Sequence, residues 1–379
     1  FFSLNLNNKP NDLGYLASFL FEKFKYKFQY ELWLDLTHEA LLTETKLKNI
    51  ICREFHNIKY NKEKNSITKE IKDQLKLNEI IQFYKTLQYN LNLQRFFPSL
   101  LEIDSPNNKE SYTLEYIPFP SLSELFLHEN LEHHVWEKII LKLKNIYDEI
   151  YSDSSGIKGL NSKDFFSNKL QKRNELLIKL FSVNKYSKLE KIYLEPYKVN
   201  SINMPPLKDG FDYIRNHLRK FDSKSRLWFG HGDLCFNNIL IDPFSLTTKL
   251  IDPKAFSSLG KKYIGFVPRN YDLAKLNHSF IGLYDSIISN MYSIQILEGN
   301  NIKLKIFHPE KYLFIKKIFS EVFFENKKLL INDINIITAS LFFTMLPLHS
   351  EDTNRMIALA IVGNSILESS DRFTSEIFK

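Results

Sequence analysis

The sequence predicts an α+β fold with two lobes, a small β-rich N-lobe followed by a large, mainly helical C-lobe. Residues 55–60 alternate like a strand, 61–65 form a polar turn, 66–71 read as the paired strand and 72–87 have the periodicity of an amphipathic helix. Beyond Glu132 helical periodicity dominates, over residues 133–151, 162–181, 208–221, 271–292, 309–324 and 332–346. Residues 51–118 are therefore assigned to the N-lobe and residues 119–379 to the C-lobe.

The composition is that of a globular protein. The chain has 379 residues and is 44% hydrophobic, enough for two lobes that each bury a core. Its formal charge of +7 comes from scattered Lys without an Arg-rich stripe, so we expect attraction for anionic substrates such as nucleotides and no nucleic-acid partner. The two cysteines, Cys52 and Cys235, are too few for a disulfide framework and suit a reducing cytoplasm.

Neither end of the chain has a targeting or membrane signal. The start lacks the charged region and long apolar stretch of a signal peptide. The apolar stretch 336–348 is interrupted by Thr344 and Pro347 and is too short to span a bilayer, so we expect no membrane insertion. Residues 1–50, which include a helical pattern over 13–24, are expected to be an N-terminal extension or the tail of an upstream domain.

The most informative segment is 229–254. It contains His231-x-Asp233-x-x-x-x-Asn238, followed 14 residues later by Asp252. One carboxylate can meet an attacking hydroxyl, while an amide and a second carboxylate hold the magnesium ion that bridges nucleotide phosphates. Residues 239–241 and 247–251 read as a hairpin around the turn 242–245, which brings Asn238 and Asp252 to neighbouring strand ends. Each polar residue alone has a structural explanation; the ordered set indicates phosphoryl transfer, with His231 shaping the loop.

His-Gly-Asp-Leu-x-x-x-Asn-Ile-Leu followed by Ile-Asp-Pro resembles the catalytic segment of the aminoglycoside phosphotransferase and choline kinase superfamily, whose fold is similar to that of protein kinases. A protein kinase would have His-Arg-Asp and Asp-Phe-Gly. In this chain Gly232 stands in place of the Arg, and Pro253-Lys254 stands in place of the Phe-Gly. The resemblance therefore implies a small-molecule hydroxyl as the acceptor, ATP as the co-substrate and Mg²⁺ as the metal.

Within that superfamily the chain is most similar to phosphotransferase modules of bacterial capsule and surface-polysaccharide loci. Such modules are often fused behind a sugar-nucleotidyltransferase domain, which implies a nucleotidyltransferase domain or subunit as a partner. Residues 33–38 resemble the end of that domain, although an N-terminal helix and linker is an equal alternative.

The nucleotide site is predicted from the N-lobe. Lys69 on the second strand is expected to reach the α- and β-phosphates, held by Glu79 on the following helix, with Lys72 as an alternative. Backbone groups of Glu115, Tyr116 and Ile117 resemble the superfamily's interlobe hinge, which meets the adenine edge. No glycine lies between Gly14 and Gly156, so a Gly-rich loop is excluded and the turn 61–65 is the candidate phosphate cover.

The acceptor site is the least defined part. Lys169 and Arg173 share a helix face and are candidates to hold an anionic acceptor or phosphate. Lys254 and Arg269 are cationic candidates near the metal site, or surface residues. His278 and His349 are candidates for the pocket wall, or packing residues. Asp272 is expected to cap a helix or, by the resemblance, to brace the catalytic loop.

These expectations describe an ATP- and magnesium-dependent kinase of a sugar, polyol or amino alcohol. A catalytically inactive nucleotide-binding regulatory module attached to a nucleotidyltransferase is the main alternative. A metal-dependent hydrolase built on His231 and Asp233 lacks further ligands within reach.

Overall fold

The computed structural model describes residues 56–71, 73–104, 111–152, 156–158, 162–222, 226–254, 260–325 and 328–368. The chain divides into two compact units, Phe1–Arg53 and Glu54–Lys379, and every described residue belongs to the second. The prediction for residues 1–50 therefore lies outside the described residues.

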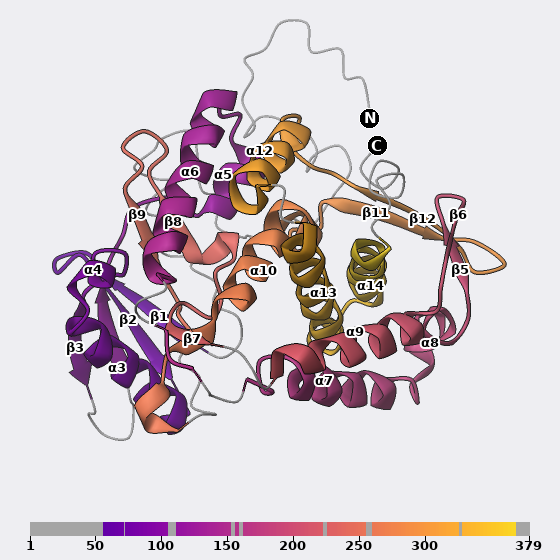
Figure 1. Ribbon diagram of the computed structural model, residues 1–379, viewed down its shortest axis with the longest axis horizontal. Coiled ribbons are helices and arrows are strands. Elements are labelled where there is room, and N and C mark those ends of the chain that lie inside the picture. Colours follow the sequence, from indigo (N-terminus) through magenta and orange to yellow (C-terminus); the bar gives the residue numbers. More distant parts are fainter. Residues whose placement is uncertain are drawn as a thin grey trace, which may run out of the picture. The chain divides into compact units, whose positions relative to one another are not determined.

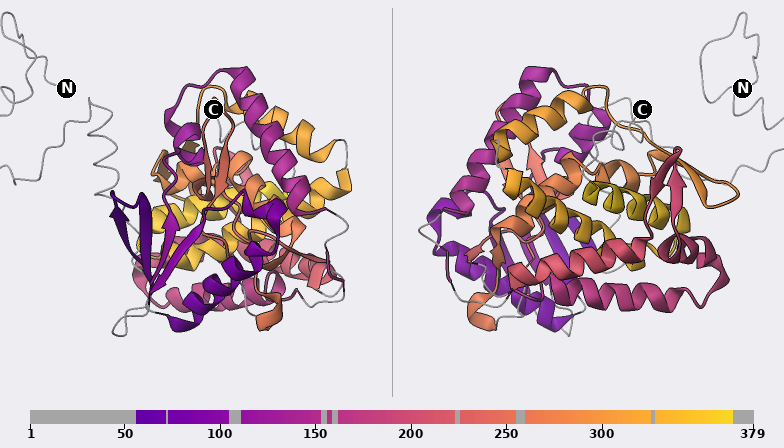
Figure 2. Two further views of the ribbon diagram at one scale, coloured as in Figure 1. Left: turned by 90° about the vertical axis from the view of Figure 1, so that its left-hand side faces the viewer. Right: turned by 45° about the vertical axis from the view of Figure 1, so that its right-hand side comes forward.

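A four-stranded antiparallel sheet with the order β1-β2-β4-β3 forms the N-lobe (Figure 1). Its strands are β1 (His56–Asn61), β2 (Ser66–Ile71), β3 (Leu100–Asp104) and β4 (Ser111–Glu115). The predicted hairpin is confirmed, with His56 opposite Ile71 and Asn61 opposite Ser66. Strand β3 was not predicted and forms one edge of the sheet, whose strands lie side by side in Figure 2.

The predicted helix after the hairpin is α3 (Gln74–Gln88), followed by the short α4 (Leu91–Gln94). Asp73 begins α3, because its carboxylate accepts hydrogen bonds from the amides of Leu75 and Lys76. The buried face of α3, which includes Phe83 and Tyr84, belongs to the same core as the sheet residues.

The C-lobe is mainly helical. Its helices are α5 (Leu122–His128), α6 (His133–Ile150), α7 (Ser167–Leu180), α8 (Ser187–Leu194), α9 (Leu207–Asp222), α10 (Arg269–Phe280), α11 (Tyr284–Ile288), α12 (Tyr312–Phe324), α13 (Lys328–Met345) and α14 (Thr353–Leu367). Short 3₁₀ turns are η2 (Asn184–Tyr186), η3 (Phe236–Asn238), η4 (Lys261–Tyr263) and η5 (Leu346–His349). Helix α13 packs against α14 and α10 at the centre of the lobe (Figure 1).

Within the described residues, one segment, Leu329–His349, is long and apolar enough to cross a membrane. Of its most apolar window, 61% is buried inside the fold. A central core helix has this composition because it is covered on most sides by other elements, and its packing against α10 and α14 is that of a core helix.

The prediction of a single helix over 271–292 is wrong, because the chain breaks between α10 and α11. Leu283 there has a left-handed φ of 50°. A Cβ on Gly282 would lie 2.6 Å from ring atoms of Phe342 and 2.8 Å from the carbonyl oxygen of His278, so only glycine fits this close approach.

The chain after α11 enters a second sheet that was not predicted, with the order β11-β12-β5-β6. Its strands are β5 (Tyr197–Val199), β6 (Ile202–Met204), β11 (Tyr292–Ile296) and β12 (Asn301–Ile306). Strands β5 and β12 pair in parallel, and the Asn200 side chain extends the pairing by bonding both the amide and the carbonyl of Leu304, at 3.0 and 2.8 Å.

Two small pairs of antiparallel strands hold segment 229–254, which the sequence analysis identifies as the candidate functional segment. Strand β7 (Leu227–Phe229) pairs with β10 (Phe266–Pro268), and β8 (Ile239–Ile241) pairs with β9 (Thr248–Leu250). The predicted hairpin is thus confirmed, with Ile239 opposite Leu250. The Asp242 carboxylate stabilises its turn by accepting from the amide of Phe244 and the hydroxyl of Ser245.

Candidate active site

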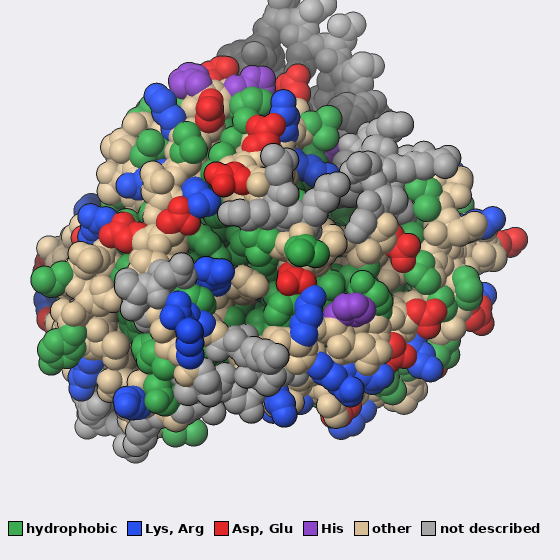
Figure 3. Space-filling view, in the orientation of Figure 1, with side chains coloured by type: hydrophobic (Ala, Val, Ile, Leu, Met, Phe, Trp, Pro, Cys, Tyr) green, Lys and Arg blue, Asp and Glu red, His purple; other side chains and the backbone are tan. Residues whose placement is uncertain are grey.

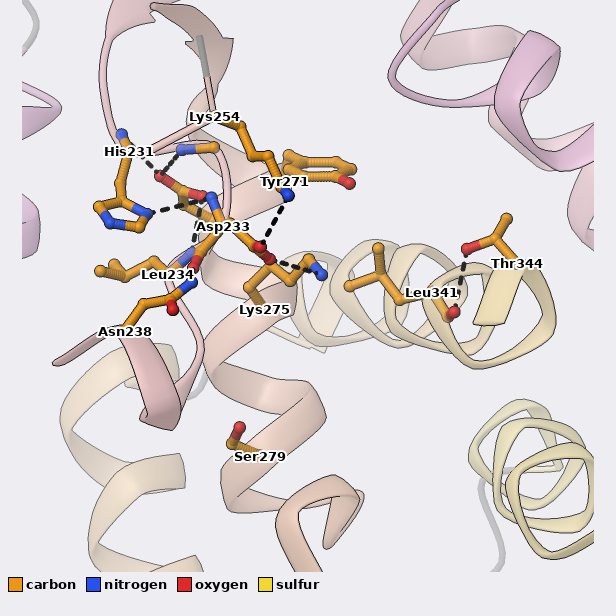
Figure 4. A network of polar contacts seen from close by, with 12 residues as sticks. His231, Asp233, Leu234, Asn238, Lys254, Tyr271, Lys275, Ser279, Leu341 and Thr344 are labelled. Carbon is orange, nitrogen blue, oxygen red and sulfur yellow. Dashed lines mark hydrogen bonds and ion pairs between the residues drawn. The ribbon is translucent and has the colours of Figure 1, made fainter. Parts of the chain in front are cut away.

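The loop after β7 turns sharply at Gly232, whose φ of 76° lies in the left-handed region that favours glycine. This turn places His231 in the interior, fully buried, and leaves Asp233 partly exposed. The amide of Asp233 donates to Nδ1 of His231 at 3.1 Å, and Nε2 of the same ring lies 2.8 Å from the carbonyl oxygen of Ile251. Because a carbonyl can only accept, the ring carries its proton on Nε2. Figure 4 shows the bond between Asp233 and the His231 ring.

Asp272 on α10 holds the loop from inside. Its carboxylate accepts from the amides of His231, Gly232 and Leu234 at 3.1, 2.9 and 3.4 Å. It also accepts from the hydroxyl of Tyr151. Burial raises the pKa of Asp272. The expected brace is therefore present, whereas the expected helix cap is not: α10 begins at Arg269 after Pro268.

Two lysines face the Asp233 carboxylate. The Nζ of Lys275, on α10, lies 2.8 Å from Oδ1, and the Nζ of Lys254 lies 3.6 Å from Oδ2. Burial disfavours ionisation of Asp233, but the two ammonium groups outweigh burial and hold the pKa of its carboxyl well below the ordinary value. Asp233 is therefore ionised in the folded protein.

Asn238 and Asp252 arrive together at the end of the β8–β9 hairpin. The amide of Ile251 donates to the carbonyl of Asn238 at 2.9 Å, so the register of the hairpin continues one residue past its strands. The side-chain amide nitrogen of Asn238 donates to the carbonyl of Asp233 at 2.8 Å. That bond uses the nitrogen and leaves the side-chain oxygen as the atom suited to a cation.

Asp252 itself is held in a left-handed backbone conformation, with φ of 54°. Non-glycine residues adopt this conformation rarely, and at a functional site the surrounding structure enforces it. Here the carbonyl of Ile251 accepts a hydrogen bond from His231, and the amide of Ile251 donates to the carbonyl of Asn238. The amide of Lys254 donates to the carbonyl of His231 at 2.8 Å. These bonds therefore hold the backbone that carries the Asp252 side chain.

The N-lobe contributes Lys69 to this site. Its ammonium pairs with the carboxylate of Asp252, and its side chain is only 11% exposed. The predicted ion pair between Lys69 and Glu79 is not formed in the described structure, since Lys69 pairs with Asp252 instead. From α3, Tyr84 interacts electrostatically with Asp252: burial raises the pKa of its phenol, and Tyr112 and Asp252 raise it further. Helix α3 thus faces the site through Tyr84.

The segment predicted as the hinge lies at the end of β4 and just beyond it. The amide of Glu115 donates to Ser99 at 3.0 Å and the amide of Tyr116 to Asn65 at 3.0 Å. These two amides are used within the N-lobe, so the prediction that backbone groups of Glu115 to Ile117 meet the adenine edge passes to the remaining backbone groups of this segment.

The candidate acceptor residues separate into two groups. Lys169 on α7 donates to the hydroxyl of Tyr271 at 2.6 Å, and Arg173 lies one turn further along the same helix. Tyr271 lies one turn before Lys275 on α10, so Lys169 is joined through Tyr271 to the helix whose Lys275 contacts Asp233. The face drawn in Figure 3 is hollowed near its middle, with blue Lys and Arg side chains beside the hollow.

The other three candidates lie elsewhere. His278 is buried and packs between the rings of Tyr284 and Phe342, at centroid distances of 4.2 and 4.0 Å. His349 ends η5 and lies 3.3 Å from Glu351. The guanidinium of Arg269 lies 5.4 Å from the ring centroid of Trp228. These contacts favour the packing alternative for the two histidines and the surface alternative for Arg269, and a role of the three in the acceptor pocket stays a prediction.

No family model matches the sequence, and no curated protein matches it. Solved structures are similar in fold. A GDP complex of a mutant aminoglycoside 2'-phosphotransferase-IIIa is 12% identical and covers 94% of this chain and 97% of its own, with a TM-score of 0.50. The wild-type GDP complex is 11% identical, covers 95% and 99%, and has a TM-score of 0.48. An aminoglycoside phosphotransferase from Streptomyces rimosus is 11% identical, covers 81% and 99%, and has a TM-score of 0.43.

The chain therefore has the two-lobed, kinase-like α+β fold of the aminoglycoside phosphotransferases. The first of these structures aligns over nearly the full length of both chains, which confirms the predicted fold class.

Proposed function

We propose that the protein is an ATP- and Mg²⁺-dependent phosphotransferase that acts on a hydroxyl of a small metabolite. The observation that carries this proposal is the tie between the catalytic loop and the metal-binding hairpin: His231 bonds Asp233 on one side and Ile251 on the other. One histidine thus fixes the position of two groups: the Asp233 carboxylate, which would meet the hydroxyl, and the strand end that carries Asp252. Asp233 would orient the acceptor hydroxyl and take its proton.

The residues of the hairpin suit magnesium. Mg²⁺ is commonly held by one or two protein oxygen ligands, with water and nucleotide phosphates completing its coordination. Asn238 offers a side-chain oxygen and Asp252 a carboxylate whose side chain is 51% exposed. When bound, the metal would neutralise charge on the nucleotide phosphates. Lys69, whose ammonium lies at Asp252, would stay beside those phosphates.

The biological setting belongs to the same proposal. The acceptor would be a sugar, polyol or amino alcohol used in capsule or surface-polysaccharide synthesis in the cytoplasm, with a nucleotidyltransferase domain or subunit as partner. What supports this is the resemblance of segment 229–254 to the modules of such loci. Since a structural neighbour was solved with GDP, both ATP and GTP belong in the test.

Two alternatives fit the site less well. A catalytically inactive regulatory module has no need for Asp233, Asn238 and Asp252 to be held so closely together. A metal-dependent hydrolase needs a cluster of ligands, and among the described residues no group of three or more His, Cys, Asp or Glu side chains could hold a metal ion.

A transfer assay tests the proposal. The protein is incubated with γ-labelled ATP or GTP, Mg²⁺ and a panel of sugars, polyols, choline and aminoglycosides. Asp233→Asn should lower transfer by about 100-fold or more, because the carboxylate that orients the hydroxyl is lost. Asp209→Asn, on the exposed side of α9, is the matched control. Transfer by Asp233→Asn at the wild-type rate would remove Asp233 from its role.

A binding measurement tests the metal separately. Asp252→Ala should weaken binding of Mg-ATP more than Asn238→Ala, because a carboxylate contributes a formal charge to a hard cation and an amide only a dipole. Calorimetric titration of Mg-ATP into both variants decides this. Wild-type affinity in both would show that the metal is held elsewhere.

A further inference from the structure

Two lysines contact Asp233, and a third is joined to them through Tyr271. Lys275 comes from α10, Lys254 from the chain just after Asp252, and Lys169 from α7. Tyr271, one turn before Lys275, links the two helices by accepting a hydrogen bond from Lys169 at 2.6 Å. The Lys169 ammonium also lies 5.1 Å from the centroid of the Tyr271 ring, so the aromatic ring fixes its position.

The charge of this cluster is not balanced. The charged groups that act most strongly on Lys169 are Lys275, Asp233, Arg173 and Lys254, of which Asp233 alone is negative. Asp233 is already engaged by Lys275 at 2.8 Å. In the described part of the chain, Lys169 and Arg173 form no ion pair with a carboxylate. The side of the site next to the catalytic carboxylate is therefore positive.

Burial and the neighbouring Lys275 lower the pKa of Lys169 to about 7. A cation in this position is destabilised by desolvation and by like charges, and a bound anion would relieve both effects. Groups perturbed in this way gather at functional sites.

We propose that Lys169, Arg173 and Lys254 form an anion subsite, and that the acceptor is an anionic hydroxy compound with a carboxylate or phosphate near the hydroxyl that meets Asp233. This inference rests on the proposed function and narrows its substrate class. In the transfer, the acceptor oxygen forms a bond to the γ-phosphorus, the bond from that phosphorus to the bridging oxygen of ADP breaks, and the hydroxyl proton passes to Asp233. Cationic acceptors such as choline and aminoglycosides would be repelled.

Matched acceptors test the subsite. Glycerol, glycerate and glycerol 3-phosphate differ mainly in charge, as do glucose, glucuronate and glucose 6-phosphate, and choline and kanamycin add two cationic acceptors. We expect the anionic members to be phosphorylated with at least about tenfold higher kcat/KM than the neutral and cationic members. The carboxylate and phosphate arms show which anion the subsite takes.

Variants of α7 assign the effect to the cluster. Lys169→Met and Arg173→Met should each raise KM for the anionic acceptor about tenfold, with a smaller change in kcat, because a charge-assisted contact to the acceptor is removed. Lys169→Arg, which keeps the charge, should restore much of the affinity even if the Met variant folds poorly. Lys172→Met, exposed on the same helix, is the control.

Failure of the anion subsite can be distinguished from failure of the proposed phosphotransferase function. Transfer that prefers neutral or cationic acceptors would overturn the anion subsite and leave the phosphotransferase intact. If no acceptor is phosphorylated, the proposed function fails, and equilibrium binding decides the subsite. For that measurement, glycerate and glycerol 3-phosphate are titrated into protein saturated with Mg²⁺ and a non-hydrolysable ATP analogue. Absent binding, or equal binding to wild type, Lys169→Met and Arg173→Met, would overturn it.

Discussion

His231 donates a hydrogen bond from Nε2 to the carbonyl oxygen of Ile251, 2.8 Å away and 20 residues later in the chain. This bond joins the loop that presents Asp233 to the strand end that presents Asp252. His231 itself is fully buried, so its ring is a positioning group and has no direct route to a ligand.

His231→Ala should therefore weaken Mg-nucleotide binding by about tenfold although the ring touches neither metal nor nucleotide. The reason is that Ile251 loses its anchor and Asp252 is no longer held in its left-handed conformation. Calorimetric titration of Mg-ATP measures the loss, and His134→Ala, on the exposed start of α6, serves as control. Unchanged affinity in a folded His231→Ala variant would contradict the positioning role.

Lys275→Met should raise the pKa of Asp233. In the wild type the Lys275 and Lys254 ammonium groups outweigh burial, and without Lys275 the burial effect that disfavours the carboxylate gains weight. Since the ionised form is needed, the acid limb of the pH–rate profile should move upward toward neutral pH. Carbon-13 NMR titration of labelled aspartates measures the same shift without an acceptor. Lys188→Met, exposed on α8, should leave the Asp233 titration in place.

Lys69 and Asp252 should be energetically coupled, and Lys69 and Glu79 should not. We expect a coupling energy of roughly 0.5–1 kcal/mol for Lys69→Met with Asp252→Asn, because Asp252 is half exposed and solvent screens the pair. Lys69→Met and Glu79→Gln should add within about 0.5 kcal/mol. Urea unfolding without metal or nucleotide gives both cycles. The reverse result would restore Glu79 as the partner of Lys69.

Asp285→Asn should change how stability depends on pH. Burial raises the pKa of Asp285, so the folded protein keeps a proton that the unfolded chain releases above a pKa of about 3.9. The contribution of Asp285 to the wild-type free energy of unfolding therefore falls as pH rises from there through the raised pKa. Asn does not titrate, so the free energy of unfolding of the variant should increase relative to that of the wild type as pH rises through this window. Urea unfolding across that range checks this, with Asp209→Asn as the exposed comparison; a constant difference for Asp285→Asn would contradict the assignment.

The parts of the site that depend on short sequence distances could be predicted. Asp233 and Asn238 are five residues apart in one loop, and the turn after Ile241 has residues that stabilise turns, so local rules bring Asn238 and Asp252 to neighbouring strand ends. The N-lobe hairpin and α3 follow from the same kind of local pattern.

Contacts over long sequence distances could not be predicted. Lys69 and Asp252 are 183 residues apart, and in a Lys-rich chain nothing local distinguishes Asp252 from Glu79 as the partner of Lys69. Lys275 was missed as the partner of Asp233 for the same reason, although its place one turn after Tyr271 on the segment containing Asp272 was a usable signal. Strands β5 and β6 have three residues each, too few for a period-2 pattern.

The β8–β9 hairpin is bonded on both of its outer sides. The amide of Leu250 donates to the carbonyl of Phe96 at 2.6 Å, and the amide of Ile241 donates to the carbonyl of Pro120 at 3.0 Å. One contact reaches the segment before β3 and the other the connector between the lobes. Separation of the lobes would break the bond from Leu250 to Phe96, so the exchange rate of the Leu250 amide hydrogen with solvent reports how often the lobes separate, and the Ile241 amide hydrogen is the comparison within the C-lobe.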